Sequence, residues 1–566
     1  MESSANIDGL TRAGATTHAD DYSHAAGRSH AAGRLRSSGR LRELLTTRRL
    51  LPFVLLSVVF ALTVAPATDP DFWWHLRTGQ FIAETRTVPR ADIFSHTAAG
   101  REWVAHEWLT EALMFAVFKG AGWAGLIGSF SLVMTAALGF AYRRAAKRAP
   151  HPFVAGAAVL LATFACAPIL GVRPQMISFL LTSVFVSVLG RYAVERRARA
   201  LWPLPALMLV WANMHGAFAL GLALVGVTIA GVLFDELFAP ADEPRAGTST
   251  HDEEGHPREG GTPKGKSRAQ AARWRLRGLW SSVRPLCVVL AACVAAVPLN
   301  PNGVRLFTYP LETIASGAMQ RHIQEWMSPD FHRAESLPFA LLLLATFVAL
   351  ALSPRKARPS ELLLLTVSAY AALRSWRNIP FFALVAAPVL AGHAWLFINE
   401  RLRASRVAAA KGREEVKAPA LQLILNASLF VVIPVGLCVV TVSRAAARQP
   451  AVEAEKYPAA AVEFLRGHKQ AGPIFNAYGW GGYLVWKLHP ERAVYMDGRA
   501  DVYGDALVED YLRAENGEPG WRAVLERDRV RAVMIAPDAA LASLLREDEG
   551  WDRVFEDKQA VIFFKR

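Results

Sequence analysis

A series of long apolar segments constrains this chain more than any other feature of its 566 residues. The first covers residues 50–67 and directly follows an arginine-rich stretch. Most approach the 20 residues that a helix needs to cross a bilayer, where peptide groups must be satisfied inside the segment itself. The sequence therefore predicts a polytopic α-helical membrane protein with about eleven transmembrane helices. The later segments cover residues 122–142, 152–170, 174–190, 200–213, 215–237, 284–299, 336–352, 360–373, 379–397 and 420–443.

The basic residues predict how these segments are oriented. The formal net charge is +14, and Arg and Lys gather in short stretches between apolar segments rather than along one face. This pattern argues against nucleic-acid binding. With a cytoplasmic N-terminus, the basic loops all lie inside, as the positive-inside rule requires. We expect a bacterial plasma membrane protein, because the Ala- and Arg-rich composition is typical of GC-rich bacteria. The loops cover residues 143–150, 191–199, 238–283, 353–359 and 398–418.

Three parts of the chain differ in composition from the apolar segments, which lie in a membrane region at residues 50–443. Residues 1–49 have almost no large apolar side chain before Leu41 and predict a disordered basic cytoplasmic tail, while residues 238–283 predict a disordered cytoplasmic loop. Residues 444–566 alternate helix-like and strand-like runs, which predicts a small extracytoplasmic α/β domain, periplasmic or extracellular. Its expected strands are residues 473–476, 493–496, 532–535 and 560–564, and its expected helices are residues 458–468, 521–528 and 539–547.

The first outer loop, residues 68–121, concentrates acidic, histidine and tryptophan side chains. It opens with Asp69, Pro70 and Asp71 and continues to the neighbouring pair His106 and Glu107. A helix is predicted after each of these motifs, lying in the membrane interface, where paired Trp residues are common. Carboxylates can act as a general base or hold a divalent cation, so the loop is a candidate reaction site. The alternative is that the first motif caps a helix.

Turns on the same predicted side carry cationic side chains. Arg173 lies in GVRPQ, and Arg374 and Arg377 lie in RSWRNIP, where the positive-inside rule disfavours arginine. Guanidinium groups pair bidentately with phosphate, which favours phosphate binding. The alternative is that they only reach lipid headgroups. His215 interrupts an apolar run, and the alternative there is a hydrogen-bonded polar turn. MDGRADVYG at residues 496–504 is interpreted as a salt-bridged turn after a strand.

An outer loop with paired acidic residues after the first membrane segment, followed by two interfacial helices, resembles the GT-C superfamily of integral membrane glycosyltransferases. The resemblance covers residues 50–443 in topology, but only DPD and the His-Glu pair in motif. It implies transfer of a sugar from a polyprenyl-phosphate donor to an acceptor at the outer face, with membrane lipid as a further partner. It implies catalytic roles for Asp69, Asp71 and Glu107, metal binding by Asp71, His106 and Glu107, and substrate binding by His75, Arg173, His215, Arg374 and Arg377.

The metal and the function both have alternatives. Carboxylates suit Mg²⁺ or Mn²⁺, whereas a histidine and a glutamate also suit Zn²⁺. A transporter or flippase of lipid-linked glycans is one rival function, but such proteins carry ionisable residues at mid-membrane, and no clear one is found here. A non-catalytic membrane anchor that presents residues 444–566 is the other rival.

Overall fold

The computed structural model describes residues 47–238, 268–402, 420–468 and 472–566. Most of the predicted tail and most of the loop at 238–283 lie outside these residues, although residues 268–283 belong to a helix. The chain divides into two compact units, Met1–Leu55 with Gly412–Gly436, and Leu56–Lys411 with Leu437–Arg566. The smaller unit includes the first residues of two helices, α2 and α16. The first outer loop and the C-terminal sheet both belong to the larger unit.

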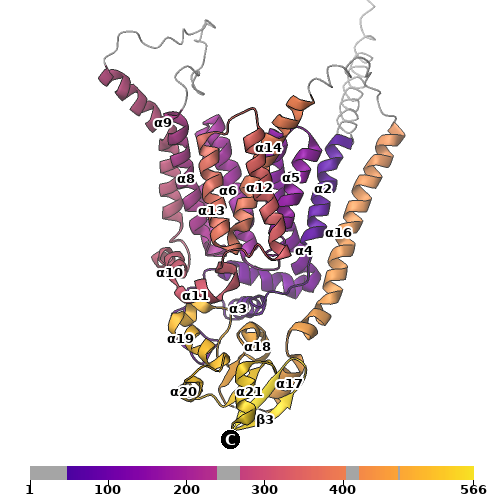
Figure 1. Cartoon of the computed structure of the whole chain (residues 1–566), viewed down its shortest axis with the longest axis vertical. Coiled ribbons are helices and arrows are strands. Elements are labelled where there is room, and N and C mark those ends of the chain that lie inside the picture. Colours follow the sequence, from indigo (N-terminus) through magenta and orange to yellow (C-terminus); the bar gives the residue numbers. More distant parts are fainter. Residues whose placement is uncertain (1–46, 239–267, 403–419, 469–471) are drawn as a thin grey trace, which may run out of the picture. The chain divides into compact units, whose positions relative to one another are not determined.

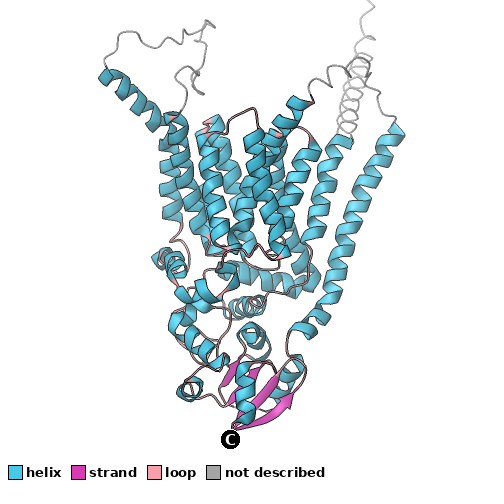
Figure 2. Cartoon of the chain, in the orientation of Figure 1, coloured by secondary structure: helices cyan, strands magenta, loops and turns pink. Residues whose placement is uncertain are grey.

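Helices dominate the described part of the chain (Figure 2). A helix coincides with each of the predicted apolar segments. Seven described helices are long and apolar enough to cross a membrane, so the chain is an integral membrane protein, and the count of eleven stays a prediction. The helices that coincide with the predicted apolar segments are α2 (Thr47–Thr63), α4 (Trp108–Arg148), α5 (Pro152–Cys166), α6 (Gln175–Glu195), α7 (Pro203–Met214), α8 (Phe218–Leu237), α9 (Arg268–Ala296), α12 (Leu337–Leu352), α13 (Pro359–Arg374), α14 (Ile379–Arg401) and α16 (Ala420–Lys456).

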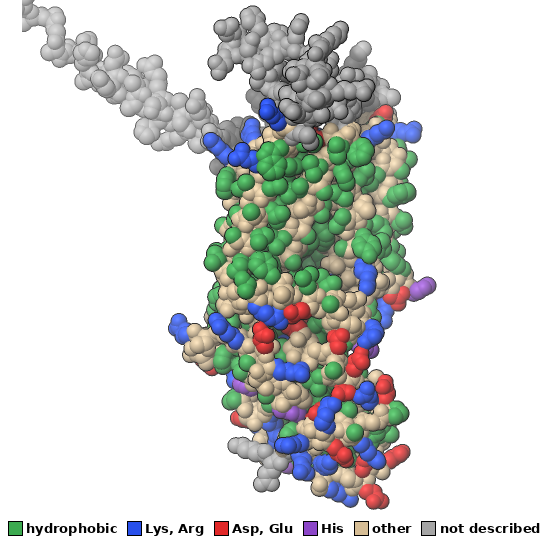
Figure 3. All heavy atoms as spheres, turned by 90° about the vertical axis from the view of Figure 1, so that its left-hand side faces the viewer, with side chains coloured by type: hydrophobic (Ala, Val, Ile, Leu, Met, Phe, Trp, Pro, Cys, Tyr) green, Lys and Arg blue, Asp and Glu red, His purple; other side chains and the backbone are tan. Residues whose placement is uncertain are grey.

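The surface has the pattern that a bilayer requires. Figure 3 shows a broad band of hydrophobic side chains on one face, with charged side chains gathered beyond its edges. Large apolar side chains on these helices are exposed, including Phe347 on α12 and Leu237 on α8. Exposed apolar area of this extent marks contact with lipid or a partner rather than with water.

The first outer loop contains two helices that lie across the long ones (Figure 1). They are α3 (Phe72–Thr85) and the first part of α4, which bends at Gly122. Gly122 has φ 57° and ψ −152°, a conformation that glycine adopts without steric cost. The bend separates the first part of α4, which ends at Ala121, from the longer part that follows it. A Cβ at Gly79 would lie 2.6 Å from the carbonyl carbon of Glu111, so glycine allows α3 and α4 to pack closely.

The C-terminal region contains a four-stranded sheet in the order β1-β2-β4-β3. β1 (Ile474–Asn476) is parallel to β2 (Ala532–Ile535), and β4 (Val561–Lys565) is antiparallel to β2 and to β3 (Trp551–Glu556). The predicted strands at 473–476, 532–535 and 560–564 are confirmed, and β3 was not predicted. The helices are α17 (Ala459–Gly467), α18 (Gly481–Leu488), α19 (Ala500–Glu515), α20 (Trp521–Arg527) and α21 (Ala540–Glu547).

The predicted strand at residues 493–496 is wrong, and the reason shows how the C-terminal region is attached. Val494 does not join the sheet but forms an isolated parallel bridge with Ser95 in the first outer loop. Val494 N donates to Phe94 O, and His96 N donates to Val494 O, each at 3.0 Å. The C-terminal region is therefore hydrogen-bonded to the loop that carries the acidic motif.

Short helices connect the two regions on another side. They are η2 (Gly303–Phe307), α10 (Tyr309–Ala315), α11 (Gly317–His322) and η3 (Gln324–Trp326). The Asp505 carboxylate of α19 accepts hydrogen bonds from Ser316 Oγ at 2.6 Å and Gly317 N at 2.9 Å. These contacts hold α11 against α19.

Candidate active site

A cavity of about 680 Å³ opens where the first outer loop, the membrane helices, the short helices and the C-terminal region meet. One side is apolar and is formed by α6, α8 and α14, with Phe179, Leu220 and Phe381 among its residues. The other side is polar. Nearly all the predicted site residues line it: Asp69, Asp71, His75, His106, Glu107, Arg173, His215 and Arg377.

Glu107 occupies the centre of the polar side and is buried. It directly precedes α4, so its position depends on the start of that helix. Its Oε1 lies 3.2 Å from His106 Nε2 and 3.2 Å from His215 Nε2, while its Oε2 lies 3.2 Å from His75 Nδ1. Three histidines from three parts of the chain therefore surround one carboxylate.

These contacts fix the charges in the cluster. Burial alone would raise the pKa of Glu107, but the neighbouring histidines outweigh it and hold this pKa well below its usual range. Burial disfavours the charged form of His106, yet Glu107 more than offsets this and raises the pKa of His106 to about 9. Burial lowers the pKa of His215 to about 3. The cluster therefore contains an ionised carboxylate, a charged His106 and a neutral His215.

Hydrogen bonds also define the tautomer of His215. Its Nδ1 accepts from Ala217 N at 3.0 Å and lies 2.9 Å from Ser178 Oγ. Because Nδ1 is an acceptor, the proton of the neutral ring is on Nε2, which faces Glu107. His215 therefore orients Glu107 by donating to it.

A second carboxylate completes a group that can hold a metal. Glu111 Oε1 lies 2.9 Å from His75 Nδ1, and ligand atoms of His75, Glu107 and Glu111 all lie within 4.8 Å of one another. Glu111 Oε2 is buried without a hydrogen-bond partner, which leaves a free ligand atom. The group therefore fits a divalent cation such as Zn²⁺ or Mn²⁺. It differs from the predicted ligand set, because Asp71 and His106 are not members of it.

Asp69 takes part in an ion-pair network at the edge of the cavity. Its Oδ2 lies 2.8 Å from Arg173 Nε, and Arg173 Nη1 also pairs with Glu325. Its Oδ1 accepts from the backbone N of Asp71 at 2.9 Å. Asp69 therefore shapes the turn before α3 and neutralises part of Arg173.

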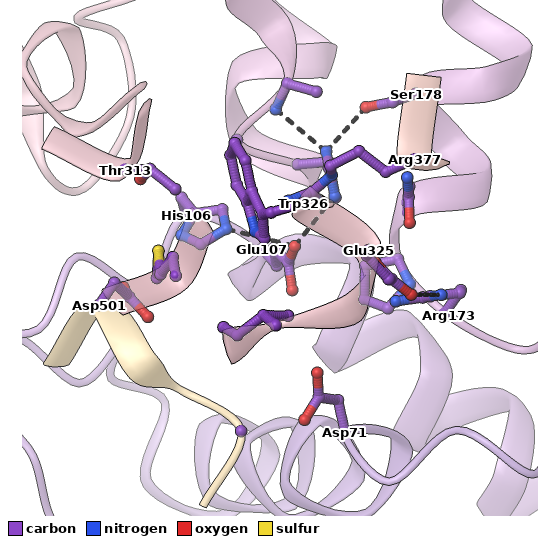
Figure 4. A pocket seen from close by; sticks show the side chains of 18 of the residues that line it. Asp71, His106, Glu107, Arg173, Ser178, Thr313, Glu325, Trp326, Arg377 and Asp501 are labelled. Atoms are coloured by element: carbon purple, nitrogen blue, oxygen red, sulfur yellow. Dashed lines mark hydrogen bonds and ion pairs between the residues drawn. The ribbon is translucent and has the colours of Figure 1, made fainter. Parts of the chain in front are cut away.

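Asp71 differs from its neighbour because its carboxylate makes no ion pair among the described residues. It stands at the N-cap position of α3 without a side-chain capping bond, which does not support the capping alternative. Its Oδ1 accepts from Trp74 Nε1 at 3.2 Å. Burial, and then the charge of Asp69, raise the pKa of Asp71 to about 7. Figure 4 shows its side chain directed into the cavity.

The two predicted arginines of RSWRNIP have different surroundings. Arg377 lines the cavity, with Cζ 4.5 Å from the centre of the Trp326 ring, and no described carboxylate lies within ion-pair distance of it. Arg374 does not line the cavity; it is exposed and donates to Gln320 Oε1 at 2.8 Å. Arg374 is the last residue of α13, whereas Arg377 lies in η5 (Trp376–Asn378), between α13 and α14.

The cavity also contains residues that the sequence analysis did not single out as site residues. Tyr309 OH lies 3.3 Å from His106 Nε2, and Asp501 lines the cavity from the first turn of α19. Figure 4 shows Asp501 and Arg173 on different sides of the pocket. Asp501 belongs to the charged MDGRADVYG motif, which could have indicated a site residue. Its position in the cavity, however, depends on how the C-terminal region packs.

Comparisons with known proteins identify the fold. No protein-family model and no curated protein matches the chain. The archaeal oligosaccharyltransferase AglB from Archaeoglobus fulgidus, in complex with an inhibitory peptide and a dolichol-phosphate, is similar in structure, with a TM-score of 0.50. It has 12% sequence identity, and the match covers 86% of this chain and 69% of AglB.

A second similar structure is ArnT from Cupriavidus metallidurans bound to undecaprenyl phosphate, with a TM-score of 0.42 and 14% identity. The match covers 90% of this chain and 97% of ArnT. The likeness to AglB shows that the chain has the fold of the GT-C membrane glycosyltransferases. The resemblance predicted from the outer-loop motif is therefore confirmed at the level of the fold.

Proposed function

We propose that this protein is a membrane glycosyltransferase that moves a sugar from a polyprenyl-phosphate donor to an acceptor hydroxyl or amine at the outer face of a bacterial plasma membrane. One observation carries the proposal. Among the described residues, Asp71 is a carboxylate without an ion pair and Arg377 is a guanidinium without a carboxylate partner, and both face the same cavity. The fold shared with AglB, whose structure holds a dolichol-phosphate, supports this reading.

Asp71 is proposed as the general base. A catalytic pKa near the working pH gives the best combination of ionised form and proton affinity, and the pKa of Asp71 is about 7. Its carboxylate takes the proton of the acceptor as the acceptor oxygen or nitrogen bonds to the sugar. The bond between the sugar and the phosphate breaks, and polyprenyl phosphate leaves. Glu107, already bound by three histidines, is assigned to holding the cluster together.

Arg377 is proposed to bind the leaving phosphate. A guanidinium stacked on Trp326 at 4.5 Å keeps its edge free for phosphate oxygens, which it binds bidentately. Arg173 is shared between Asp69 and Glu325, so it contributes less positive charge. The apolar side of the cavity, with Phe179, Leu220 and Phe381, suits the first isoprenyl units of the donor.

A divalent cation has a defined place in this proposal. His75, Glu107 and Glu111 would hold it, and when bound it would supply a positive charge that stabilises negative charge developing nearby. Asp71 and Arg377 are not part of this group, so the roles proposed for their side chains do not require the cation.

The outer-face location rests on the positive-inside rule. The non-catalytic anchor is less well supported, because the C-terminal region lines the cavity instead of standing apart from it.

The test measures polyprenyl phosphate, because this product is released from the donor whichever sugar is transferred. The purified full chain in lipid nanodiscs is incubated with polyprenyl-phosphate mannose, polyprenyl-phosphate glucose and a membrane extract as the source of acceptor. The release of free polyprenyl phosphate is measured by mass spectrometry. We expect release by the wild type and a loss of about 100-fold or more in Asp71→Asn.

Asp538→Asn is the matched control, because Asp538 is exposed and does not line the cavity. Full release by a folded Asp71→Asn protein would disprove the assignment of the base. In sealed proteoliposomes that contain a labelled donor, movement of the donor across the bilayer without release of polyprenyl phosphate would instead indicate a flippase.

A further inference from the structure

Two glycines of the C-terminal region pack directly against the DPD motif. A Cβ at Gly482, in α18, would lie 2.6 Å from the carbonyl oxygen of Pro70 and 3.3 Å from Trp74 Cδ1. A Cβ at Gly498 would overlap Asp71 Oδ1 and lie 2.6 Å from Asp71 Cγ. The DPD motif and the start of α3 therefore pack against two glycines, at positions where a side chain would collide with them.

The requirement at position 498 is steric. Gly498 does not have a left-handed backbone conformation, so its φ and ψ do not exclude a side chain. The three atoms nearest to an added Cβ all belong to the Asp71 carboxyl group, with Oδ2 at 3.1 Å. Gly498 is therefore constrained by one residue that lies far from it in the sequence.

The backbone around Gly498 is fixed on both sides. Asp497 Oδ2 pairs with Arg499 Nη2 at 2.6 Å, and the same Nη2 pairs with Asp92 at 2.7 Å. All three side chains are buried. Breaking a buried ion pair is strongly unfavourable, so the loop cannot easily retreat from Asp71.

The backbone of Asp71 is fixed as well. Its N donates to Asp69 Oδ1 at 2.9 Å, and its carbonyl accepts from His75 N at 3.2 Å in the first turn of α3. With both backbones held, a side chain at 498 is accommodated mainly by rotation of the Asp71 carboxylate. That rotation breaks the bond from Trp74 Nε1.

We propose that Gly498 is a positioning residue that sets the direction of the Asp71 carboxylate in the cavity. The C-terminal region thus contributes to the reaction site through a glycine, which leaves room for the Asp71 carboxylate. The catalytic consequence rests on the proposed function, because it requires Asp71 to be the base. The steric coupling between the two residues does not depend on it.

A thermal double-mutant cycle tests the coupling. Gly498→Ala, Asp71→Ala and the double variant are compared with the wild type as full chains in nanodiscs. We expect Gly498→Ala to lower Tm when Asp71 is present and to leave Tm unchanged in the Asp71→Ala background. Gly467→Ala, at an exposed glycine where an added Cβ meets nothing within 4 Å, is the control. An equal Tm change in both backgrounds, or none in either, would overturn the proposal.

The functional consequence is measured by the release of polyprenyl phosphate. We expect Gly498→Ala to lower kcat about 100-fold with the KM for the donor nearly unchanged, since a small misplacement of a catalytic group has effects of this size. The rate is expressed per folded protein, quantified by size-exclusion chromatography, because a loss of folded protein would also lower the apparent kcat without changing KM. Coupling in Tm with a normal kcat would overturn the positioning role.

A wild type without transfer would refute the proposed function. In that case, electron cryomicroscopy of Gly498→Ala decides the positional claim. We expect the Asp71 carboxylate to turn away from residue 498, and an unchanged direction would refute the proposal.

Discussion

Arg499 Nη2 lies 2.7 Å from Asp92 Oδ1 and joins the C-terminal region to the first outer loop. Both side chains are almost completely buried, and Arg499 also stacks on Trp103, with 4.5 Å between Cζ and the ring centre. This ion pair holds the connection between α3 and α4 against the segment that carries Gly498 and Asp501. One buried cation thus connects the first outer loop to the C-terminal region.

Replacing this cation should destabilise the protein more than replacing an exposed one. Arg499→Met leaves Asp92 and Asp497 buried without a positive charge, at a cost of about 3–5 kcal/mol. We expect a large fall in Tm and rapid proteolysis of the C-terminal region. Arg527→Met, which removes an exposed cation paired with Asp510 and Asp528, should cost less than about 1 kcal/mol. Equal Tm losses would contradict the structural role of Arg499.

The helical part of the fold could be predicted because its causes are local. Segment length and apolar composition determine whether a helix suits a bilayer, and the helices lie where the apolar segments predicted them. Gly122 was not recognised as the bend in α4, because positive φ becomes apparent only when both flanking helices are placed. The incorrect strand at 493–496 shows the same limit. Its residues favour a strand, but their partner is Ser95, which only the tertiary structure brings near.

The site residues that could be predicted from the sequence are polar residues next to the end of an apolar segment. Asp71, His215 and Arg377 stand out in this way, and the cavity contains all three. Arg374 has the same sequence context as Arg377, but the turn directs it away from the cavity. Asp501 was missed because MDGRADVYG indicates a salt-bridged turn. That turn exists at Asp497 and Arg499, while Asp501 faces the cavity.

Activity should depend on pH through Asp71. Burial and Asp69 raise the pKa of Asp71 to about 7, whereas His75 and Arg173 oppose this rise. A general base works as the carboxylate, so the rate should increase with pH and reach half its plateau near pH 7. One pH unit lower, about a tenth of the carboxyl is ionised and the rate should fall about tenfold. The release of polyprenyl phosphate between pH 5.5 and 8.5 measures this.

Asp69→Asn provides the comparison for the pH profile. Removing the negative charge nearest to Asp71 removes one cause of the raised pKa, so the midpoint should move to lower pH. Asp71→Asn should give a low rate with no such midpoint. A midpoint that stays in place in Asp69→Asn would contradict the assignment of the titrating group to Asp71.

Binding of the lipid phosphate should distinguish the two neighbouring arginines. Arg377→Ala removes the guanidinium that lies over Trp326 in the cavity, and a charged hydrogen bond to phosphate is worth about 1.5–3 kcal/mol, or roughly 10- to 100-fold in Kd. Arg374→Ala should bind normally, since Arg374 lies outside the cavity. Binding of dolichol phosphate in nanodiscs, measured by native mass spectrometry, tests both. Equal weakening would indicate general attraction to the headgroup.

The buried cluster around His75 should retain a divalent cation during purification. His75, Glu107 and Glu111 present ligand atoms within 4.8 Å, and Glu111 Oε2 has no hydrogen-bond partner. Glu111→Gln should weaken metal binding by about 10-fold or more, as changes around a metal centre commonly do. Glu102→Gln, at an exposed carboxylate paired with Arg305, is the control. Elemental analysis of protein purified from metal-supplemented medium gives the readout. A metal-free wild type would contradict this prediction. In that case the proton on His75 Nδ1, which lies between Glu107 and Glu111, would be enough to stabilise the two buried carboxylates.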